Sequence, residues 1–277
     1  MKGKVIAVWF SCGAASAVAA KKTIEKYGKD NTIRVINSPV LEEDSDNRRF
    51  LADIEKWLGV EIEIAINPKF PSCSIVDVFN HTPYMSGPKG AACTFQLKKQ
   101  SRKIWEDKNH HDYLVLGFTA EEKKRHDTFA LTERSNVLPV LIEEGITKFD
   151  CFRIIREAGI ELPRIYAMGY PNANCIGCVK VTSPAYWSLV REKHPEYFAE
   201  RAKQSRAIKC KLVQLGGKRI FLDELPDVQY RPFNKPLNKI YVDCGIFCEE
   251  KIKNDRAGKS KKGNKEASSP AGEDRAV

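Results

Sequence analysis

Short apolar segments alternate with amphipathic segments over the first half of the chain, and this alternation is the feature that most limits the fold. The apolar segments are KVIAVWF, IRVIN, EIEIAI and YLVLGF. Between them, helical patterns cover about residues 14–26, 46–58 and 94–107. Buried strands separated by helices are typical of a parallel sheet with helices on both faces. The sequence therefore predicts an α/β fold with a doubly wound, Rossmann-like parallel sheet.

The pattern changes near residue 137, where helical segments replace the strands. Thr147 and Asp150 have the spacing of a capping box for a helix that runs through Glu157. We expect an α/β domain over residues 1–136 and a smaller, mostly helical, cysteine-rich region over 137–250. Residues 251–277 contain eight Lys or Arg, four Asp or Glu and almost no large apolar side chains. Burial cannot offset the entropy of ordering such a segment, so we expect a disordered basic tail.

Composition and length exclude several classes of protein. The 277 residues are enough for one large domain or for one domain with a smaller appendage. No apolar run approaches the roughly 18 residues needed to cross a bilayer, and the first residues lack a secretory cleavage pattern. The sequence therefore predicts a cytoplasmic protein with no membrane partner. In that setting the nine cysteines favour metal-binding or catalytic thiols over a disulfide framework.

Two cysteine pairs in the C-terminal half predict a metal site. Cys175 and Cys178 are separated by two residues, and Cys244 and Cys248 by three. Four thiolates so arranged are able to hold either a tetrahedral Zn²⁺ or a [4Fe–4S] cluster, and the ligand set does not choose between them. The alternative is a redox-active or buried CxxC motif together with two unrelated cysteines.

The net charge of +10 favours a polyanionic partner such as tRNA or DNA. The basic tail supplies +4 of this charge, which leaves +6 for the rest of the chain. Basic segments such as QLKKQSRK and EEKKRHD are therefore candidates for contacts with the phosphates of a nucleotide or an RNA. Solvated helix faces have the same composition, and for the tail a solubilising end is the favoured interpretation over a polyanion-binding arm.

The first apolar segment ends in SCGAAS, a turn suited to binding an anion. Ser11 and Ser16 offer hydroxyls, and Gly13 leaves the backbone accessible at the start of the following helix. The turn has neither the Lys of a GxxxxGK[ST] loop nor the third glycine of a dinucleotide-binding fingerprint. A turn selected for tight strand-to-helix packing is the alternative interpretation.

Several motifs together resemble the phosphoadenosine phosphosulfate (PAPS) reductase family. They are the SCGAAS loop, LEEDSDNRRF after the second strand, ACTFQLKK and the GFTAEEKKR element after the fourth strand. The resemblance covers about residues 5–125 and implies the fold of the adenine nucleotide alpha-hydrolases, a superfamily that includes PP-loop ATP pyrophosphatases. YPNANCIGCVK, AYWSLVREKHPEYFAERA and DCGIFC extend it to a PAPS reductase-like branch common in phages and bacteria.

The resemblance implies roles for individual residues. Ser11, Gly13 and Ser16 would hold the phosphates of ATP or PAPS, while Asn37 and Ser38 would lie near the base or ribose.

Other residues would complete the pocket of the family. Lys98 would meet a phosphate or sulfate, and Gly117, Glu121 and Arg125 would close the pocket from the fourth strand. Besides these, Cys12 lies near a helix amino terminus and near cationic residues, which favours a lowered pKa and reactivity. Cys93 would be its partner across the cleft; the alternative interpretation is that both cysteines are small loop residues without chemistry.

Three positions depart from the family pattern. Cys12 replaces the first glycine of the SGGxDS loop, and Ala15 replaces the aspartate expected near the pyrophosphate or Mg²⁺. Nucleotide binding is compatible with this change, whereas efficient cleavage of ATP is not expected. Phe247 stands where the reductases have a histidine after their catalytic cysteine, so Cys244 is interpreted first as a metal ligand.

The sequence thus predicts an enzyme that adenylates an acceptor and transfers sulfur to it from a thiol or a sulfur-donor protein. The acceptor would be a nucleobase of tRNA, a DNA backbone or a small molecule. One alternative is a thiol-dependent sulfonucleotide reductase in which Cys244 attacks sulfur. Another is a non-catalytic, zinc-stapled module that binds an adenine nucleotide.

Overall fold

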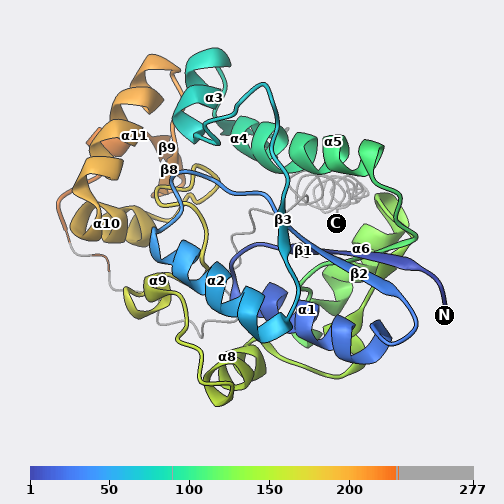
Figure 1. The fold of residues 1–277 in the computed structure, drawn as a ribbon. Coiled ribbons are helices and arrows are strands. Elements are labelled where there is room, and N and C mark those ends of the chain that lie inside the picture. Colours follow the sequence, from blue (N-terminus) through green and yellow to red (C-terminus); the bar gives the residue numbers. More distant parts are fainter. Residues whose placement is uncertain (89, 229, 231–277) are drawn as a thin grey trace, which may run out of the picture.

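A five-stranded, all-parallel sheet forms the centre of the computed structural model, which describes residues 1–88, 90–228 and 230 (Figure 1). Its strands are β1 (Val5–Phe10), β2 (Thr32–Asn37), β3 (Ile62–Ile64), β6 (Tyr113–Val115) and β7 (Val137–Leu138). Helices flank the sheet, which confirms the predicted α/β class and is consistent with a Rossmann-like layout.

The strand order β3-β2-β1-β6-β7 creates a switch point beside β1. The chain moves outward from β1 to β3 and then returns to the opposite side of β1 with β6. The β1–β6 pairing ends at Val8 opposite Val115, so the last two residues of β1 have no partner in β6. Ligands of open α/β sheets bind in the crevice outside the carboxyl ends of the strands at such a point.

Alternate residues of β1 face opposite helix layers, as the period of a strand requires. Ile6, Val8 and Phe10 belong to the core that contains α1 (Ala14–Tyr27) and α2 (Asp46–Leu58). Ala7 and Trp9 face the other layer, which contains α5 (Ser101–Lys108) and α6 (Lys123–Thr132). The bounds predicted for α2 are confirmed, and Gly59 ends that helix with a φ of 68°.

The helix predicted over residues 94–107 is not regular. It consists of α4 (Ala92–Thr94), a π-helix, η1 (Phe95–Gln100), and then α5. π-Helical turns are rare and often occur at functional sites. The sequence pattern gave no sign of it, because apolar spacing over one or two turns does not distinguish the two helix types.

The sheet extends past the predicted domain limit at residue 136. β7 pairs with β6, and α7 (Val140–Glu143) and α8 (Lys148–Glu157) pack into the same core as α1. A strand of two residues is too short to produce a periodic signal, which explains why four strands were predicted instead of five. The capping box of α8 is confirmed, since Asp150 N donates to Thr147 Oγ1 at 3.1 Å and Thr147 N donates to Asp150 Oδ2 at 3.0 Å.

A second hydrophobic core joins α3 (Ile75–His81) to the C-terminal helices, which Figure 1 shows at the same end of the molecule. The remaining elements are β4 (Ser86–Gly87), β5 (Gly90–Ala91), η2 (Ala120–Glu122), α9 (Arg164–Ala167), α10 (Pro184–Lys193), α11 (Pro195–Ala207), β8 (Val213–Leu215), β9 (Lys218–Ile220) and η3 (Leu222–Glu224). Among the helices described, none has the length and apolar character that a membrane span requires.

Candidate functional site

A cavity of about 230 Å³ lies at the carboxyl edge of the sheet, where the chain leaves β1 and β6. The predicted site residues that line it are Ser11, Gly13, Ser16, Ser38, Cys93, Lys98, Gly117, Arg125 and Cys175. The structure therefore brings most of the predicted nucleotide residues to one place, together with one cysteine of the CxxC motif. Cys244 and Cys248 lie outside the described residues.

The loop after β1 is held by its own hydroxyl groups. Ser16 Oγ accepts from Ser11 N at 3.1 Å and donates to the Gly13 carbonyl at 2.9 Å, and it lies 3.2 Å from Ser11 Oγ. Helix α1 begins at the next residue, Ala14, so the partial positive charge of its amino terminus lies at the cavity wall. The hydroxyl groups and the helix amino terminus together are suited to bind an anionic group. The hydrogen bonds within the loop hold this conformation without a ligand.

Gly117 permits the chain after β6 to touch this loop. A Cβ added at Gly117 would lie 2.7 Å from Ser16 N and 2.9 Å from Ser16 Cα, which is too close for any side chain. At Gly13 the nearest atom to an added Cβ would be Tyr166 Oη, at an ordinary 3.6 Å. The tight packing thus requires the glycine after β6, not the one in the loop.

Cys12 and Asn37 do not line the cavity but contact each other next to the end of β1. Asn37 Nδ2 donates to the Phe10 carbonyl at 2.8 Å and lies 3.5 Å from Cys12 Sγ. Burial raises the pKa of Cys12, and Glu43 raises it further, so the predicted lowering of this pKa is wrong. Desolvation at 3% exposure outweighs the nearby Lys98. The backbone of Cys12 has a φ of 54°, a conformation that favours glycine.

Lys98 lies on the π-helix η1 and connects it to the end of β2. Its Nζ donates to the Ser38 carbonyl at 2.5 Å and to Glu43 Oε1 at 3.1 Å. The Ser38 hydroxyl is buried and has no hydrogen-bond partner in the described chain. This hydroxyl is thus suited to bind a polar group of a ligand.

Arg125 and Glu121 have different surroundings. Arg125 Nη1 binds Glu122 Oε1 at 2.5 Å, and its guanidinium lies 5.2 Å from the centre of the Phe118 ring. Glu121 instead accepts from the backbone N–H of Lys148 at 3.2 Å, at the start of α8, and does not line the cavity. Glu122 lies in the cavity wall where Glu121 was expected.

Sequence reasoning missed Lys148 and Tyr166, both of which line the cavity. Lys148 Nζ donates to the Pro171 carbonyl and to Asn172 Oδ1, each at 2.6 Å, and burial lowers its pKa. Tyr166 Oη accepts from Ala14 N at 3.4 Å, and burial raises the pKa of Tyr166 to about 12. No local pattern marks these residues, because their position depends on contacts between distant segments.

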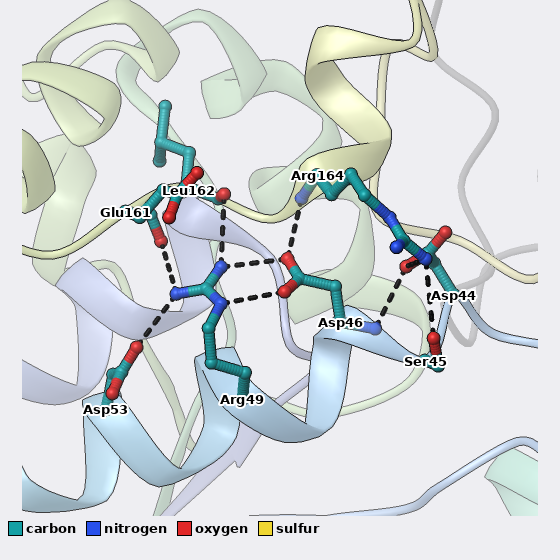
Figure 2. A network of polar contacts seen from close by, with 8 residues as sticks. All are labelled: Asp44, Ser45, Asp46, Arg49, Asp53, Glu161, Leu162 and Arg164. Atoms are coloured by element: carbon teal, nitrogen blue, oxygen red, sulfur yellow. Dashed lines mark hydrogen bonds and ion pairs between the residues drawn. The ribbon is translucent and has the colours of Figure 1, made fainter.

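A network of ion pairs holds the segment that carries Tyr166 (Figure 2). Asp46 binds Arg49 at 2.7 and 2.8 Å, and it also accepts from the backbone N–H of Arg164 at 2.8 Å. Arg49 Nη1 donates to the Glu161 carbonyl at 3.0 Å, and Arg164 Nη2 donates to Asp44 Oδ1 at 2.8 Å. These contacts tie α9 to the start of α2 and so position Tyr166 over the loop.

Cys175 and Cys178 lie on a tight, buried turn. Gly177 between them has a φ of 68°, and Tyr186 Oη accepts from Cys178 N at 2.8 Å. Burial and the two neighbouring cysteines raise the pKa of Tyr186. Both cysteines of the predicted metal site that the structure describes are therefore buried. In the part of the chain that the structure describes, no three His, Cys, Asp or Glu side chains gather as a metal site.

Comparisons with known proteins do not extend this description. No protein-family model matches the chain, and no curated protein matches it.

Proposed function

We propose that the chain is a PAPS reductase-like enzyme that binds an adenine nucleotide, adenylates an acceptor and transfers sulfur to it. One observation carries the proposal. The loop of residues 11–16 at the switch point of the sheet shares a cavity with Cys93 and Cys175. An anion-binding loop and thiols in one cavity would allow a nucleotide-activated group and a sulfur nucleophile to meet.

Residues from three segments would hold the nucleotide. The amino terminus of α1 and the side chains of Lys98 and Arg125 provide positive charge for the phosphates. The buried Ser38 hydroxyl would bind the ribose or base. Ala15 offers no carboxylate to Mg²⁺, and the carboxylates that line the cavity, Glu43 and Glu122, already bind Lys98 and Arg125. Mg²⁺ would therefore be held mainly by the phosphates and by water.

The proposed reaction has two balanced steps. An acceptor oxygen attacks the α-phosphorus of ATP, which forms an acceptor–AMP ester and releases pyrophosphate and the proton of the acceptor. Sulfur at the oxidation level of hydrosulfide, supplied by an external donor, then attacks the activated carbon and displaces AMP. The bound nucleotide would thus turn a poor leaving group, the acceptor oxygen, into a good one.

Cys175 and Cys178 would supply half of the ligands to a metal centre, with Cys244 and Cys248 as the expected other half. A [4Fe–4S] cluster there would carry or deliver sulfur, whereas Zn²⁺ would be structural. The turn at Gly177 directs both cysteines to the same buried region, next to the cavity wall.

The alternative enzymatic function is thiol-dependent reduction of a sulfonucleotide, which the shared cavity of nucleotide loop and cysteines also favours. A thiolate would attack the sulfur of PAPS, form an S-sulfocysteine and release adenosine 3′,5′-bisphosphate. A thiol reductant would then release sulfite and form a disulfide. The replacement of the loop aspartate by Ala15 favours the third function, nucleotide binding without turnover.

The test is a binding and turnover assay on protein purified without oxygen. We expect ATP to bind and Lys98→Met to weaken its binding roughly 10-fold or more, because a charge-assisted contact to phosphate is lost. Lys103→Met is the matched control, since Lys103 is exposed and pairs with Asp107 on the same helix. Absence of ATP and PAPS binding to the wild type would overturn the proposal. Labelled ATP and PAPS would show which substrate turns over.

A further inference from the structure

Arg102 of α5 lines the cavity but is not among the nucleotide residues predicted from the sequence. The residue is 7% exposed, and its Nε and Nη1 atoms are buried without a hydrogen-bond partner in the described residues. Leaving a buried guanidinium without acceptors costs free energy, because the desolvated N–H groups are not compensated. The arrangement therefore indicates an acceptor that arrives with a ligand.

The neighbouring carboxylate does not satisfy Arg102. Glu106 Oε1 lies 3.7 Å from Arg102 Nε, which is an ion-pair distance but longer than a hydrogen bond. The other oxygen, Glu106 Oε2, binds Arg134 Nη2 at 2.5 Å. Two guanidiniums thus share the Glu106 carboxylate, and the charge of Glu133 also acts on Arg102 without forming a hydrogen bond to its Nε or Nη1.

Trp9, which also lines the cavity, adds a further donor. Its Nε1 is buried and has no hydrogen-bond partner within residues 1–88, 90–228 and 230, and its ring packs edge-on against Trp105 of α5. Trp9 faces the α5 side of the sheet, whereas the loop of residues 11–16 leads into α1 on the other side. The two sets of donors therefore come from different helix layers.

The cavity's other cations differ from Arg102 because the chain itself provides their acceptors. Lys98 binds Glu43 and the Ser38 carbonyl, Lys148 binds Asn172, and Arg125 binds Glu122. We infer that Arg102 and Trp9 Nε1 form a second oxyanion subsite that binds a phosphate or sulfate group. This inference rests on the proposed nucleotide site, because it assigns to one ligand two anionic groups, one at the loop and one at Arg102.

The experiment measures the affinities of wild type and Arg102→Gln by calorimetry. The probes are AMP, ATP and adenosine 3′,5′-bisphosphate, together with inorganic phosphate and sulfate. We expect the variant to lose roughly 10-fold to 100-fold in affinity for a probe that carries the second oxyanion, and less than about 3-fold for AMP. A loss of affinity for ATP alone would show that the second oxyanion belongs to the phosphate chain. A loss of affinity for adenosine 3′,5′-bisphosphate alone would show that it is the 3′-phosphate.

Two controls keep the inference open to refutation. Lys103→Gln removes an exposed cation of the same helix, which pairs with Asp107 and does not line the cavity, and it should leave the affinities unchanged. Trp9→Phe keeps an aromatic ring and removes the N–H, so it tests the subsite if Arg102→Gln does not fold. Equal losses for AMP and the larger probes, or no loss for any probe, would overturn the subsite. If the wild type binds no nucleotide, the proposed function fails. The subsite is then tested only by the affinities of wild type and Arg102→Gln for inorganic phosphate and sulfate.

Discussion

Two walls of the cavity are built in different ways. In the wall around residues 11–16 the side-chain hydrogen bonds are local, since Ser11 and Ser16 bind each other and the nearby backbone. The adjoining wall, which includes Tyr166 and Cys175, depends on residues more than a hundred positions away from Tyr166 in the chain, such as Asp46. The first wall should therefore tolerate changes in the second, whereas the second should fail when its distant supports are removed.

The contact between Gly117 and the loop should be the most sensitive point of the first wall. Gly117→Ala places a methyl group against the Ser16 backbone, and we expect a loss of about 3 kcal/mol in the free energy of unfolding. Gly13→Ala is the matched variant in the same site, and its ordinary contacts predict a loss below about 1 kcal/mol. Urea denaturation of both variants measures the difference. Equal losses would show that the close approach of Gly117 does not matter.

Removing Asp46 should weaken the second wall. Asp46→Asn breaks charge-assisted hydrogen bonds to Arg49 and to the backbone of Arg164, and we expect a loss of about 2 kcal/mol at neutral pH. Asp107→Asn, which removes an exposed pair with Lys103, should cost only about 0.5 kcal/mol. Chemical denaturation checks both values.

The same network predicts a dependence of stability on pH. The Arg49 guanidinium holds the pKa of Asp46 below its ordinary value, so the unfolded chain binds a proton more readily than the native state does. This contribution is present above the unfolded pKa of about 4 and is lost as the pH falls through the folded pKa. The difference in stability between wild type and Asp46→Asn should therefore shrink below about pH 4. A constant difference down to pH 2 would contradict this assignment.

The smallest expected change in stability comes from the left-handed backbone conformation of Cys12. Cys12→Ala removes the thiol but keeps the unfavourable φ of 54°, whereas Cys12→Gly also relieves it. We expect the glycine variant to be about 1 kcal/mol more stable than the alanine variant. Thermal unfolding of the pair isolates the backbone contribution, because both variants lack the buried sulfur. An alanine variant as stable as the glycine variant would show that the loop relaxes without strain.

Local patterns were sufficient for the parts of the fold with strong periodicity. Helix α2 and its end at Gly59, and the capping box of Thr147 and Asp150, follow from side chains within a few positions of each other. β7 and the π-helix were missed, since a two-residue strand and a change in helix type leave no periodic signal. For the site, the loop residues and Gly117 were found, but Lys148, Tyr166 and Arg102 were not.

The sequence by itself determined the α/β class, the loop after the first strand and the position of the CxxC motif, because each depends on residues close together in the chain. Only the tertiary structure decided which side chains share the cavity. It buried Cys12, where desolvation raises its pKa, and it brought Cys93 and Cys175 to the wall beside the loop. It also left Arg102 Nε and Nη1 and Trp9 Nε1 without acceptors among the residues that the structure describes. Burial and long-range contacts set these properties, and neither can be read from the spacing of residues.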